Sequence, residues 1–394
     1  MKIVKKAGNV LQYVKCLILY LAAALVSLFV RRSEKYRDLW LVAERGADAR
    51  DNGYHFFRYL RMTHPEINCV YAIDDASPDY ARVSALGRTV RTGSFAHYVA
   101  FVCAAVKIST HVMGYAPDAY RFAILDRKAG IVKGKKVFLQ HGIINNDISE
   151  LRHDMLKLDL FICSTTGEYE ALSGYGHPDG VLRRIGLCRY DALEAEHEVK
   201  RQILVMPTWR YYLRPLDDKE FCESEYYREF NSLLTDERLH RILEENDYEL
   251  AFYVHYELQK FSPLFSSTGS PRVKVRTMAD SDVQKLLMES AMLITDYSSV
   301  FFDFAYMRKP LAHWMFDYDL FYADQYGEGY MKLKTDGFGP ACRDKDDVVD
   351  LIEYEIQNGM TVDEPYRTRI ENTFAGLPSD HCEQTYRAIL DLFK

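Results

Sequence analysis

The chain has 394 residues, of which 48% are hydrophobic and 27% are charged, and its formal net charge is −7. This length exceeds what one hydrophobic core usually supports, so two domains are expected, and the composition excludes a disordered or fibrous chain. The acidic balance argues against general nucleic-acid binding, which needs a basic surface.

The first predicted element is an apolar helix over residues 16–30, CLILYLAAALVSLFV, with lysines before it and Arg31 and Arg32 after it. This run is shorter than the ~20 residues that span a bilayer, and no small-residue cleavage site of a secretory signal follows it. The basic flanks favour a helix in the anionic cytoplasmic leaflet, and a core helix of the first domain is the alternative. We therefore expect residues 1–33 to associate with the cytoplasmic face of the cell membrane, which makes the protein peripheral or monotopic.

Short apolar runs, separated by helical stretches, follow in two series. The strands expected in the first series are 39–44, 67–73, 106–109, 137–140 and 158–164, with a helix over 52–63. The strands expected in the second series are 202–206, 250–254, 273–275, 291–295 and 310–315. Such alternation predicts parallel sheets with helices on both faces.

The polar segment 191–200 is the natural hinge between the two series. We expect an α/β fold of two facing Rossmann-like, doubly wound domains, the first over 34–190 and the second over 191–372. The helical pattern of residues 373–394 predicts a C-terminal helix that packs back on the first domain.

Polar residues follow several of the predicted strands, where open α/β sheets bind their ligands. His141 follows 137–140, His255 follows 250–254, and Thr208 and Arg210 follow 202–206. Two histidines and a guanidinium at such positions suit proton transfer and phosphate binding. The structural alternatives are a turn residue for His141, a surface cation for Arg210 and an aromatic-cluster residue for His255.

Residues 293–305, LITDYSSVFFDFA, form the most informative segment. They predict a buried strand ending at Thr295, a turn with Asp296, Ser298 and Ser299, and an apolar helix that carries Asp303. A helix that begins on two serines just after a strand offers free N–H groups and hydroxyls, which suits a phosphate or pyrophosphate. An ordinary serine N-cap is the alternative.

Other common sites are absent from the sequence. It has no GxGxxG, Walker A or nucleophile-elbow pattern at a strand end. The eight cysteines are scattered without a CxxC pair, which is typical of a reduced cytosolic protein and shows no zinc pattern. No metal cluster is visible in the sequence.

The segments LITDYSSVFFDFA, MPTWR (206–210), QHG (140–142) and GLCRYDAL (186–193) resemble motifs of the CDP-glycerol glycerophosphotransferase family, whose members build teichoic acids and related capsule polymers. Residues 51–83 also resemble the first-domain segment of this family. The resemblance covers residues 40–390 in outline. It implies a GT-B type fold and transfer of a polyol phosphate, with glycerol phosphate the leading choice, from a CDP-activated donor. The acceptor is expected to be a hydroxyl of a lipid-linked cell-surface polymer or its precursor, and CMP is released.

The resemblance also implies residue roles. His141 would be the general base, because an imidazole can take a proton near physiological pH, and His255 and Arg210 would hold the donor phosphates. Ser298 and Ser299 would bind the pyrophosphate. Thr208, Thr295, Asp296 and Asp303 complete the expected donor site. The partners would be CDP-glycerol or a related CDP-polyol, the lipid-linked acceptor and the membrane leaflet, without nucleic acid; no cofactor is required, and Mg²⁺ has no support in the sequence.

Two departures from the family pattern concern residues near the expected site. HGIINND (141–147) stands where the family commonly has HGTPLK, and Gly186-Leu187-Cys188-Arg189 replaces a glycine-proline-arginine step. The first departure leaves the acceptor open. Two alternatives remain: a nucleotide-sugar glycosyltransferase on the same fold, and a non-catalytic membrane-bound scaffold.

Overall fold

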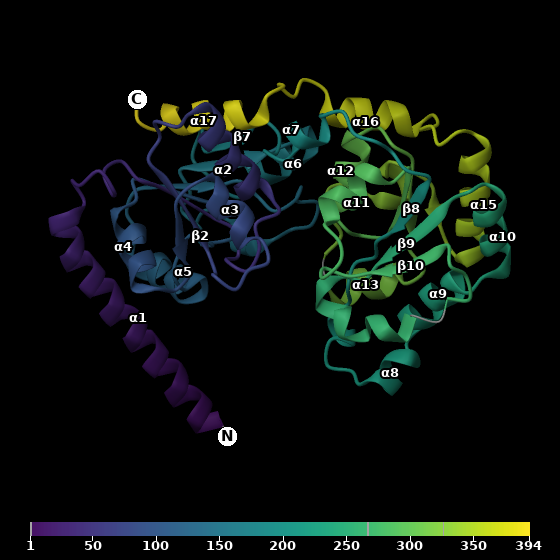
Figure 1. Ribbon diagram of the computed structural model, residues 1–394, viewed down its shortest axis with the longest axis horizontal. Coiled ribbons are helices and arrows are strands. Elements are labelled where there is room, and N and C mark those ends of the chain that lie inside the picture. The colour runs from purple at the N-terminus through teal and green to yellow at the C-terminus, as the bar shows by residue number, and fades with distance from the viewer. Residues whose placement is uncertain (1, 266–267, 326) are drawn as a thin grey trace. The chain divides into compact units, whose positions relative to one another are not determined.

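The computed structural model describes residues 2–265, 268–325 and 327–394. The chain forms two compact units (Figure 1). The first contains the chain up to Ile143 together with Ile148–Ala192 and Leu377–Lys394, and the second contains Ile144–Asp147 and Leu193–Gly376. Each unit has one parallel sheet with helices between its strands, which confirms the expected α/β class.

The sheet of the first unit has seven parallel strands in the order β3-β2-β1-β4-β5-β6-β7. The strands are β1 (Trp40–Ala43), β2 (Cys69–Ile73), β3 (Thr89–Arg91), β4 (Val106–Ser109), β5 (Lys135–Phe138), β6 (Leu160–Cys163) and β7 (Leu182–Arg184). The residues of β1, β2, β4 and β6 are buried throughout, as expected for strands covered on both faces.

Helices cover both faces of this sheet. They are α1 (Lys2–Val30), α2 (Asn52–Thr63), α3 (Tyr80–Leu86), α4 (Phe95–Cys103), α5 (Ala119–Ala129), η1 (Ser149–Leu151), α6 (Thr166–Ser173), α7 (Tyr190–Leu193) and α17 (His381–Asp391). In α2, which matches the expected helix, Phe56, Phe57 and Leu60 are spaced on one face and fully buried. Asp51 caps its N-terminus by accepting the Asn52 N–H at 2.7 Å.

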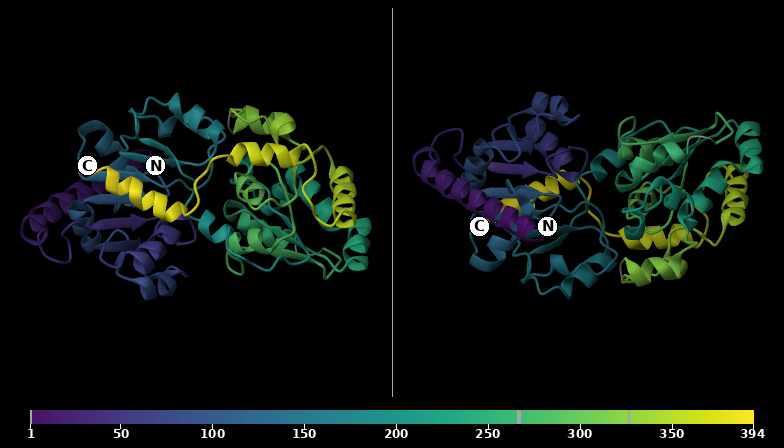
Figure 2. Two further views of the ribbon diagram at one scale, coloured as in Figure 1. Left: turned by 90° about the horizontal axis from the view of Figure 1, so that it is seen from above. Right: turned by 90° about the horizontal axis from the view of Figure 1, so that it is seen from below.

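The C-terminal helix α17 lies across the first unit and contacts α2 and β6 (Figure 2). Asp191 holds its first turn, since its two carboxylate oxygens accept the N–H groups of His381 at 2.7 Å and Cys382 at 2.9 Å. Two otherwise unsatisfied helix donors are thereby paired.

The helix α1 is longer than the expected run and packs along α4. Its segment Leu11–Val30 has a mean hydropathy of 2.2 and is long enough to cross a membrane, which corrects the estimate of a run too short to do so. The Tyr20 ring meets Phe101 and Phe122, and its hydroxyl donates to the Ile131 carbonyl at 2.8 Å. One stripe of the helix is thereby attached to the first unit.

The sheet of the second unit has six parallel strands in the order β10-β9-β8-β11-β12-β13. The strands are β8 (Gln202–Val205), β9 (Glu249–Tyr253), β10 (Val273–Arg276), β11 (Met292–Thr295), β12 (Leu311–Trp314) and β13 (Ala341–Cys342). The helices are η2 (Tyr211–Leu213), α8 (Asp218–Cys222), α9 (Glu225–Leu234), α10 (Glu237–Glu245), η3 (Tyr256–Phe265), α11 (Val283–Glu289), α12 (Val300–Tyr306), α13 (Tyr318–Asp324), α14 (Leu333–Asp336), α15 (Lys345–Gln357) and α16 (Tyr366–Phe374). Phe230, Phe252 and Trp314 are among the buried aromatic residues of its core.

Three strands, β3, β7 and β13, lie at sheet edges and were not expected from the sequence. They have two or three residues each, and most of these side chains are partly or fully exposed. Strands this short have no apolar run to mark them, and only their pairing with a neighbouring strand defines them.

The fold predicts a pH-dependent loss of stability from a buried histidine in α4. His97 is 0% exposed, accepts the Gly93 N–H at its Nδ1 (3.1 Å) and lies 3.0 Å from the Tyr115 carbonyl through Nε2. Burial lowers the pKa of His97 to about 4. Below pH ~6.5 the His97 imidazole binds a proton in the unfolded chain but stays neutral in the folded chain. The free energy of unfolding of the first unit should therefore fall by about 3 kcal/mol as the pH falls to about 4.

Hydrogen–deuterium exchange of the α4 amides at pH 7 and pH 4.5 measures this loss after correction for intrinsic exchange rates. In His97→Gln the difference between the two pH values should shrink. The same difference in both proteins would show that His97 is not held neutral in the fold.

Candidate functional site

The strand order of the first unit reverses between β1 and β4, and ligands of open α/β sheets bind at such a switch point. The chain runs outward from β1 through β2 to β3 and returns to β4, so the loops after β1 and β4 diverge. Asp51 ends the loop after β1, His111 follows β4, and His141 follows β5. These three residues gather at the carboxyl edge of the sheet.

His141 and Asp51 form a direct pair. The His141 Nδ1 lies 2.6 Å from the Asp51 Oδ2. The side chain of His141 is 62% exposed, whereas that of Asp51 is 12% exposed. The imidazole therefore faces a buried carboxylate with one nitrogen, and its Nε2 has no hydrogen-bond partner in the described part of the chain.

Arg189 and Asn52 hold this pair from behind. The Arg189 Nη1 donates to the Asp51 Oδ1 at 2.9 Å and to the His141 carbonyl at 2.7 Å. Asn52 donates from Nδ2 to the Gln140 carbonyl at 2.8 Å and accepts the Arg189 N–H at 3.0 Å. Gln140 has a φ of 64°, a left-handed conformation that a non-glycine residue keeps only when its surroundings impose it.

The electrostatics of this edge follow from burial and from these contacts. Burial alone would raise the pKa of Asp51, yet His141 and Arg189 hold it well below its usual value, so the carboxylate is ionised. Burial and the neighbouring His141 lower the pKa of His111 to about 3, and its ring centre lies 4.7 Å from that of His141. Burial, with the nearby Asp51, raises the pKa of Glu44 to about 8.

The sheet of the second unit reverses between β8 and β11. The loops that diverge there are 206–210 and 296–299, which contain five of the expected donor-site residues. Two hydrogen bonds connect these loops. The Asp296 Oδ1 accepts the Thr208 N–H at 2.8 Å, and the Thr295 Oγ1 donates to the Met206 carbonyl at 2.7 Å. Thr295 and Asp296 are 2% and 0% exposed, so they act from inside the loops.

Arg210 lies in a buried ion cluster. Its Nε and Nη2 donate to the two carboxylate oxygens of Asp317 at 2.6 and 2.9 Å, and Nη2 also lies 2.9 Å from the Asp296 Oδ2. Although burial alone would lower it, the two carboxylates raise the pKa of Arg210 above its usual value. The side chain is 1% exposed, so the guanidinium supports the loops from within and has no free surface for a phosphate in this structure.

Ser298 and Ser299 begin the turn into α12 and are partly exposed. Within the described residues, their hydroxyls and the N–H groups of Ser298, Ser299 and Val300 have no hydrogen-bond acceptor. Asp303 lies in the first turn of α12 and is 4% exposed. Three N–H groups and two hydroxyls at one helix start suit an anion.

His255 follows β9, beside Trp209. The two rings are stacked with centres 6.1 Å apart and an interplanar angle of 19°. The His255 Nδ1 accepts the Glu257 N–H at 3.3 Å, so in the neutral ring the proton lies on Nε2. The structure thus places His255 in an aromatic cluster, since its ring stacks on Trp209 and lies 4.5 Å from the centre of the Tyr256 ring.

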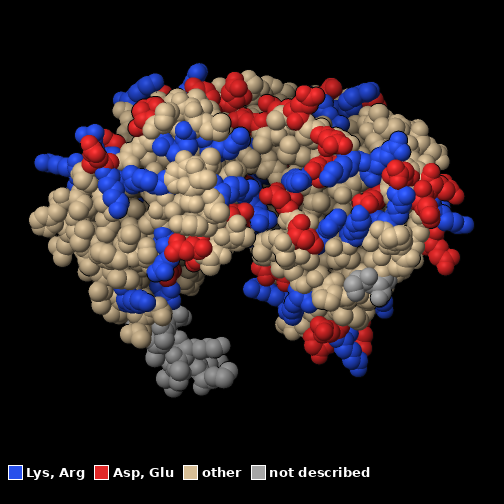
Figure 3. Space-filling model, in the orientation of Figure 1, with Lys and Arg blue, Asp and Glu red and all other residues tan. Residues whose placement is uncertain are grey.

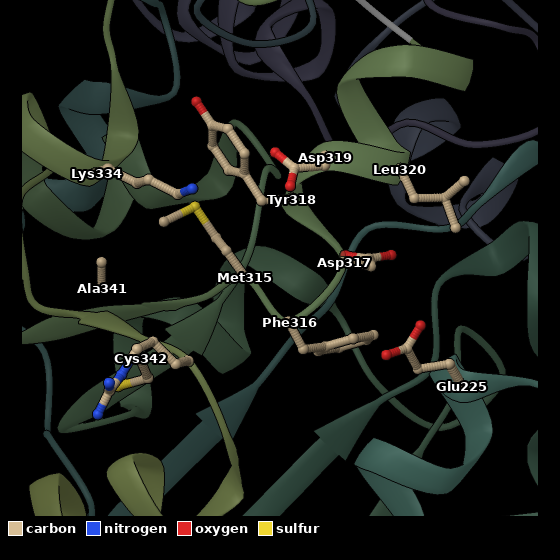
Figure 4. A pocket seen from close by; sticks show the side chains of 11 residues that line it. Glu225, Met315, Phe316, Asp317, Tyr318, Asp319, Leu320, Lys334, Ala341 and Cys342 are labelled. Atoms are coloured by element: carbon tan, nitrogen blue, oxygen red, sulfur yellow. The ribbon is translucent and has the colours of Figure 1, made fainter.

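A pocket of about 680 Å³ opens at the carboxyl ends of β12 and β13 (Figure 4). Asp317 of the Arg210 cluster lines it, and Lys334 places its Nζ 3.5 Å from the centre of the Tyr318 ring. The pocket therefore joins acidic, basic and aromatic side chains, and its Asp317 accepts a hydrogen bond at 3.1 Å from the Tyr297 hydroxyl of the 296–299 loop. No cluster of three or more His, Cys, Asp or Glu side chains that could hold a metal ion occurs in residues 2–265, 268–325 and 327–394.

Sequence reasoning missed Asp51, Asn52, Arg189 and Asp317 as site residues. Asp51 reads as an ordinary helix N-cap, which it also is. Its pairing with His141 joins residues 90 positions apart, and no local pattern contains that information. The available signals were the positions of Asp51 and Asn52 at the start of the family-like segment 51–83 and of Arg189 within the family-like segment 186–193.

Solved structures with the same fold include a variant of the wall teichoic acid polymerase TagF, with a TM-score of 0.69 and 16% identity. The match covers 99% of this chain and 98% of that chain. A putative UDP-N-acetylglucosamine 2-epimerase from Listeria monocytogenes matches with a TM-score of 0.56 and 12% identity over 90% of this chain and 96% of its own. At these identities the likeness establishes the fold.

Relatives in sequence come from teichoic acid synthesis. The minor teichoic acid biosynthesis protein GgaB of Bacillus subtilis (strain 168) is 30% identical over 371 residues, which are 90% of this chain and 40% of GgaB. The teichoic acid poly(glycerol phosphate) polymerase of the same strain is 30% identical over 156 residues, or 39% of this chain and 19% of the relative. The chain therefore spans less than half the length of these two relatives.

The family model described as CDP-Glycerol:Poly(glycerophosphate) glycerophosphotransferase matches residues 24–376. This range contains both switch points, the His141–Asp51 pair and the 296–299 loop. With most of the chain matched and the fold shared, the chain belongs to the CDP-glycerol:poly(glycerophosphate) glycerophosphotransferase family.

Proposed function

We propose that this protein transfers glycerol phosphate from CDP-glycerol to a hydroxyl of a lipid-linked cell-surface polymer or its precursor and releases CMP. The observation that carries the proposal is the family match over residues 24–376, which includes a histidine–carboxylate pair at the sheet edge of the first unit and a hydroxyl-rich helix start in the second. One solved TagF variant was soaked with CDPG, which supports a CDP-glycerol donor for this family.

The second unit binds the donor in this proposal. Ser298, Ser299 and the free N–H groups of their turn donate to the pyrophosphate, and His255 donates to it from Nε2. Arg210, Thr295 and Asp296 contribute from behind, because their mutual contacts fix the loops that present the exposed donors. Thr208 lies in the first of these loops, and Asp303 lies in the helix that follows the second.

The first unit supplies the base. The acceptor hydroxyl oxygen attacks the phosphorus that carries glycerol, a new O–P bond forms, and the P–O bond to CMP breaks with its electron pair leaving on CMP. His141 accepts the hydroxyl proton at Nε2, the nitrogen that has no partner within the described chain. Protein donors meet the charge on the phosphates, so the proposed transfer needs no metal or other cofactor.

The base assignment predicts a large loss of rate in His141→Ala. CMP release from CDP-glycerol, measured with a lipid-linked acceptor, should fall by ~10²–10⁴-fold because general base catalysis is lost. His64→Asn, at the opposite end of α2, is the matched control and should retain activity. Unchanged CMP release in His141→Ala would show that His141 is not the general base.

The same assay separates the alternatives for the reaction. CDP-ribitol and UDP-N-acetylglucosamine replace CDP-glycerol in parallel, and nucleotide release from the UDP-sugar alone would favour a glycosyltransferase. Binding of CDP-glycerol without turnover, tested with several acceptors, would favour a scaffold. Activity lost on treatment with EDTA would contradict a metal-free transfer.

The donor assignment predicts weaker binding when the turn hydroxyls are removed. The double variant Ser298→Ala/Ser299→Ala should raise the Kd for CDP-glycerol by roughly 10–30-fold, since each hydrogen bond contributes about 1 kcal/mol. The backbone N–H groups remain and keep residual binding. Isothermal titration with Ser232→Ala as control tests this, because that hydroxyl is bonded within α9, and equal Kd values would exclude the turn from the donor site.

We also propose that α1 attaches the protein to the cytoplasmic face of the cell membrane. Only 17% of its apolar segment is buried, which is too little for a core helix. The surface along the described part of α1 is mostly uncharged (Figure 3), and exposed basic residues, Arg31 and Arg32, follow it. Its outward face carries large apolar side chains: Leu11, Ile18, Leu21, Leu25, Leu28 and Phe29.

Polar substitutions on this outward face should release the protein from membranes. Replacing Leu21, Leu25 and Leu28 by Gln removes three exposed leucines, and liposome binding should fall by at least ~10²-fold, given about 1.5–3 kcal/mol for each buried leucine. The matched control replaces exposed apolar residues outside α1, namely Met62, Val199 and Leu390, by Gln. Equal sedimentation of both variants with anionic vesicles would show that α1 is not the anchor.

A further inference from the structure

We propose that Asp51 is the positioning residue of His141: its carboxylate holds the imidazole in the tautomer with the proton on Nδ1, and Arg189 anchors that carboxylate. This inference rests on the proposed function, because it explains how the base is prepared for the reaction. It concerns a residue that does not touch the substrate.

The tautomer follows from the contact itself. An ionised carboxylate can only accept hydrogen bonds, so at 2.6 Å the His141 Nδ1 is the donor. A neutral imidazole has one N–H, so Nε2 then has a lone pair and no proton. The His141 side chain is 62% exposed, and Nε2 has no hydrogen-bond partner in the described part of the chain, so an acceptor hydroxyl can approach this nitrogen.

Two donors other than His141 keep the Asp51 carboxylate in place. Oδ1 accepts the Asn52 N–H at 2.7 Å and the Arg189 Nη1 at 2.9 Å, which leaves Oδ2 directed at the His141 ring. Because a buried carboxylate needs compensation, this arrangement is stable only while the guanidinium is present. Arg189 is itself 8% exposed, so the ion pair is screened little by solvent.

The backbone of His141 is held by the same group. Arg189 donates to the His141 carbonyl at 2.7 Å, and Asn52 donates to the carbonyl of Gln140, whose φ is 64°. The side chain and the main chain of the base are thus attached to one helix start, that of α2. A base fixed in this way needs little reorganisation when the proton moves.

The other titratable groups around the pair do not replace Asp51. His111 faces the His141 ring from the loop after β4, and its lowered pKa keeps it neutral. Glu44 lies behind the loop after β1 and accepts the N–H groups of Arg50 at 3.0 Å, Asp51 at 3.1 Å and Tyr54 at 2.8 Å. Asp51 is the carboxylate that reaches the ring.

During the transfer, the proton of the acceptor hydroxyl moves to Nε2 as its oxygen forms the bond to phosphorus and the electron pair of the broken P–O bond leaves with CMP. His141 becomes an imidazolium, and the Asp51 carboxylate stabilises this positive charge without taking the proton. The proton passes to solvent after CMP departs.

Asp51→Asn is the decisive variant. The amide oxygen can keep the contacts to Asn52 and Arg189, and asparagine is as good an N-cap as aspartate. The amide NH₂ then faces His141, so Nδ1 must become the acceptor and the proton moves to Nε2. CMP release from CDP-glycerol should fall by on the order of 10²-fold or more.

Asp118→Asn is the matched control. Asp118 also caps a helix of the first unit, α5, by accepting the Arg121 N–H at 3.0 Å, and it also pairs with an arginine. It has no contact with a histidine in the described chain. Its variant should keep CMP release within a few fold, while its thermal midpoint reports what losing a capping carboxylate does to stability.

Long-range ¹H–¹⁵N NMR of the histidine rings gives a readout that a merely structural role would not move. In the unmodified protein at pH 8 the His141 signals, assigned by their absence in His141→Ala, should show protonated Nδ1, and in Asp51→Asn they should show protonated Nε2. Protonated Nε2 in the unmodified protein would overturn the inference, whether or not the variant folds.

The outcomes also separate this inference from the proposed function. Full CMP release in Asp51→Asn, with none in His141→Ala, would overturn the role of Asp51 and leave the base in place. Full CMP release in His141→Ala would overturn the proposed function instead.

Discussion

A carboxylate removed from water costs several kcal/mol unless cations and N–H groups compensate it, and each unit of this protein has such a carboxylate at its switch point. In the first unit Asp51 is compensated by Arg189 and by the start of α2. In the second unit Arg210 and the N–H groups of the two diverging loops offset part of the cost of burying Asp296, although burial still raises the pKa of this carboxyl group. Parallel strands bring the loops to one edge of each sheet, and these ion pairs fix the positions of the side chains and N–H groups that the loops expose at that edge.

The two compensated carboxylates serve different chemistry because their remaining oxygens face different groups. At Asp51 one oxygen is left for His141, so the charge faces an exposed imidazole, which is the proposed base. At Asp296 the oxygens are used within the loops, and the exposed groups are the neighbouring Ser298 and Ser299 with their N–H donors. Phosphoryl transfer depends on preorganised charge, and a rigid interior beneath an exposed donor set meets that requirement.

The central strands could be predicted because Val, Ile and Leu runs of four or five residues, bounded by polar turns, have few other uses. The helix start at Ser299 could also be predicted from local sequence, because two serines stand between a predicted strand and an apolar helix. Burial at the site could not be predicted. Arg210 looks like a phosphate clamp in sequence, and only the fold places Asp317, 107 residues away, against two of its three donor nitrogens, Nε and Nη2. Asp51 likewise has a complete local explanation as an N-cap, which conceals its second contact with His141.

The role of the segment after His141 could not be predicted from the sequence either. In sequence, HGIINND looks like a change in acceptor recognition, yet Ile144–Asp147 belongs to the second unit. There Asn145 exchanges two hydrogen bonds with the Met331 backbone, at 3.0 and 3.2 Å, and its carbonyl accepts the Tyr330 N–H at 3.2 Å. A Cβ on Gly329 would lie 2.0 Å from that carbonyl oxygen, so the close approach requires glycine. The Asn145 side chain is therefore used to attach a loop within the second unit, a role that the sequence does not reveal.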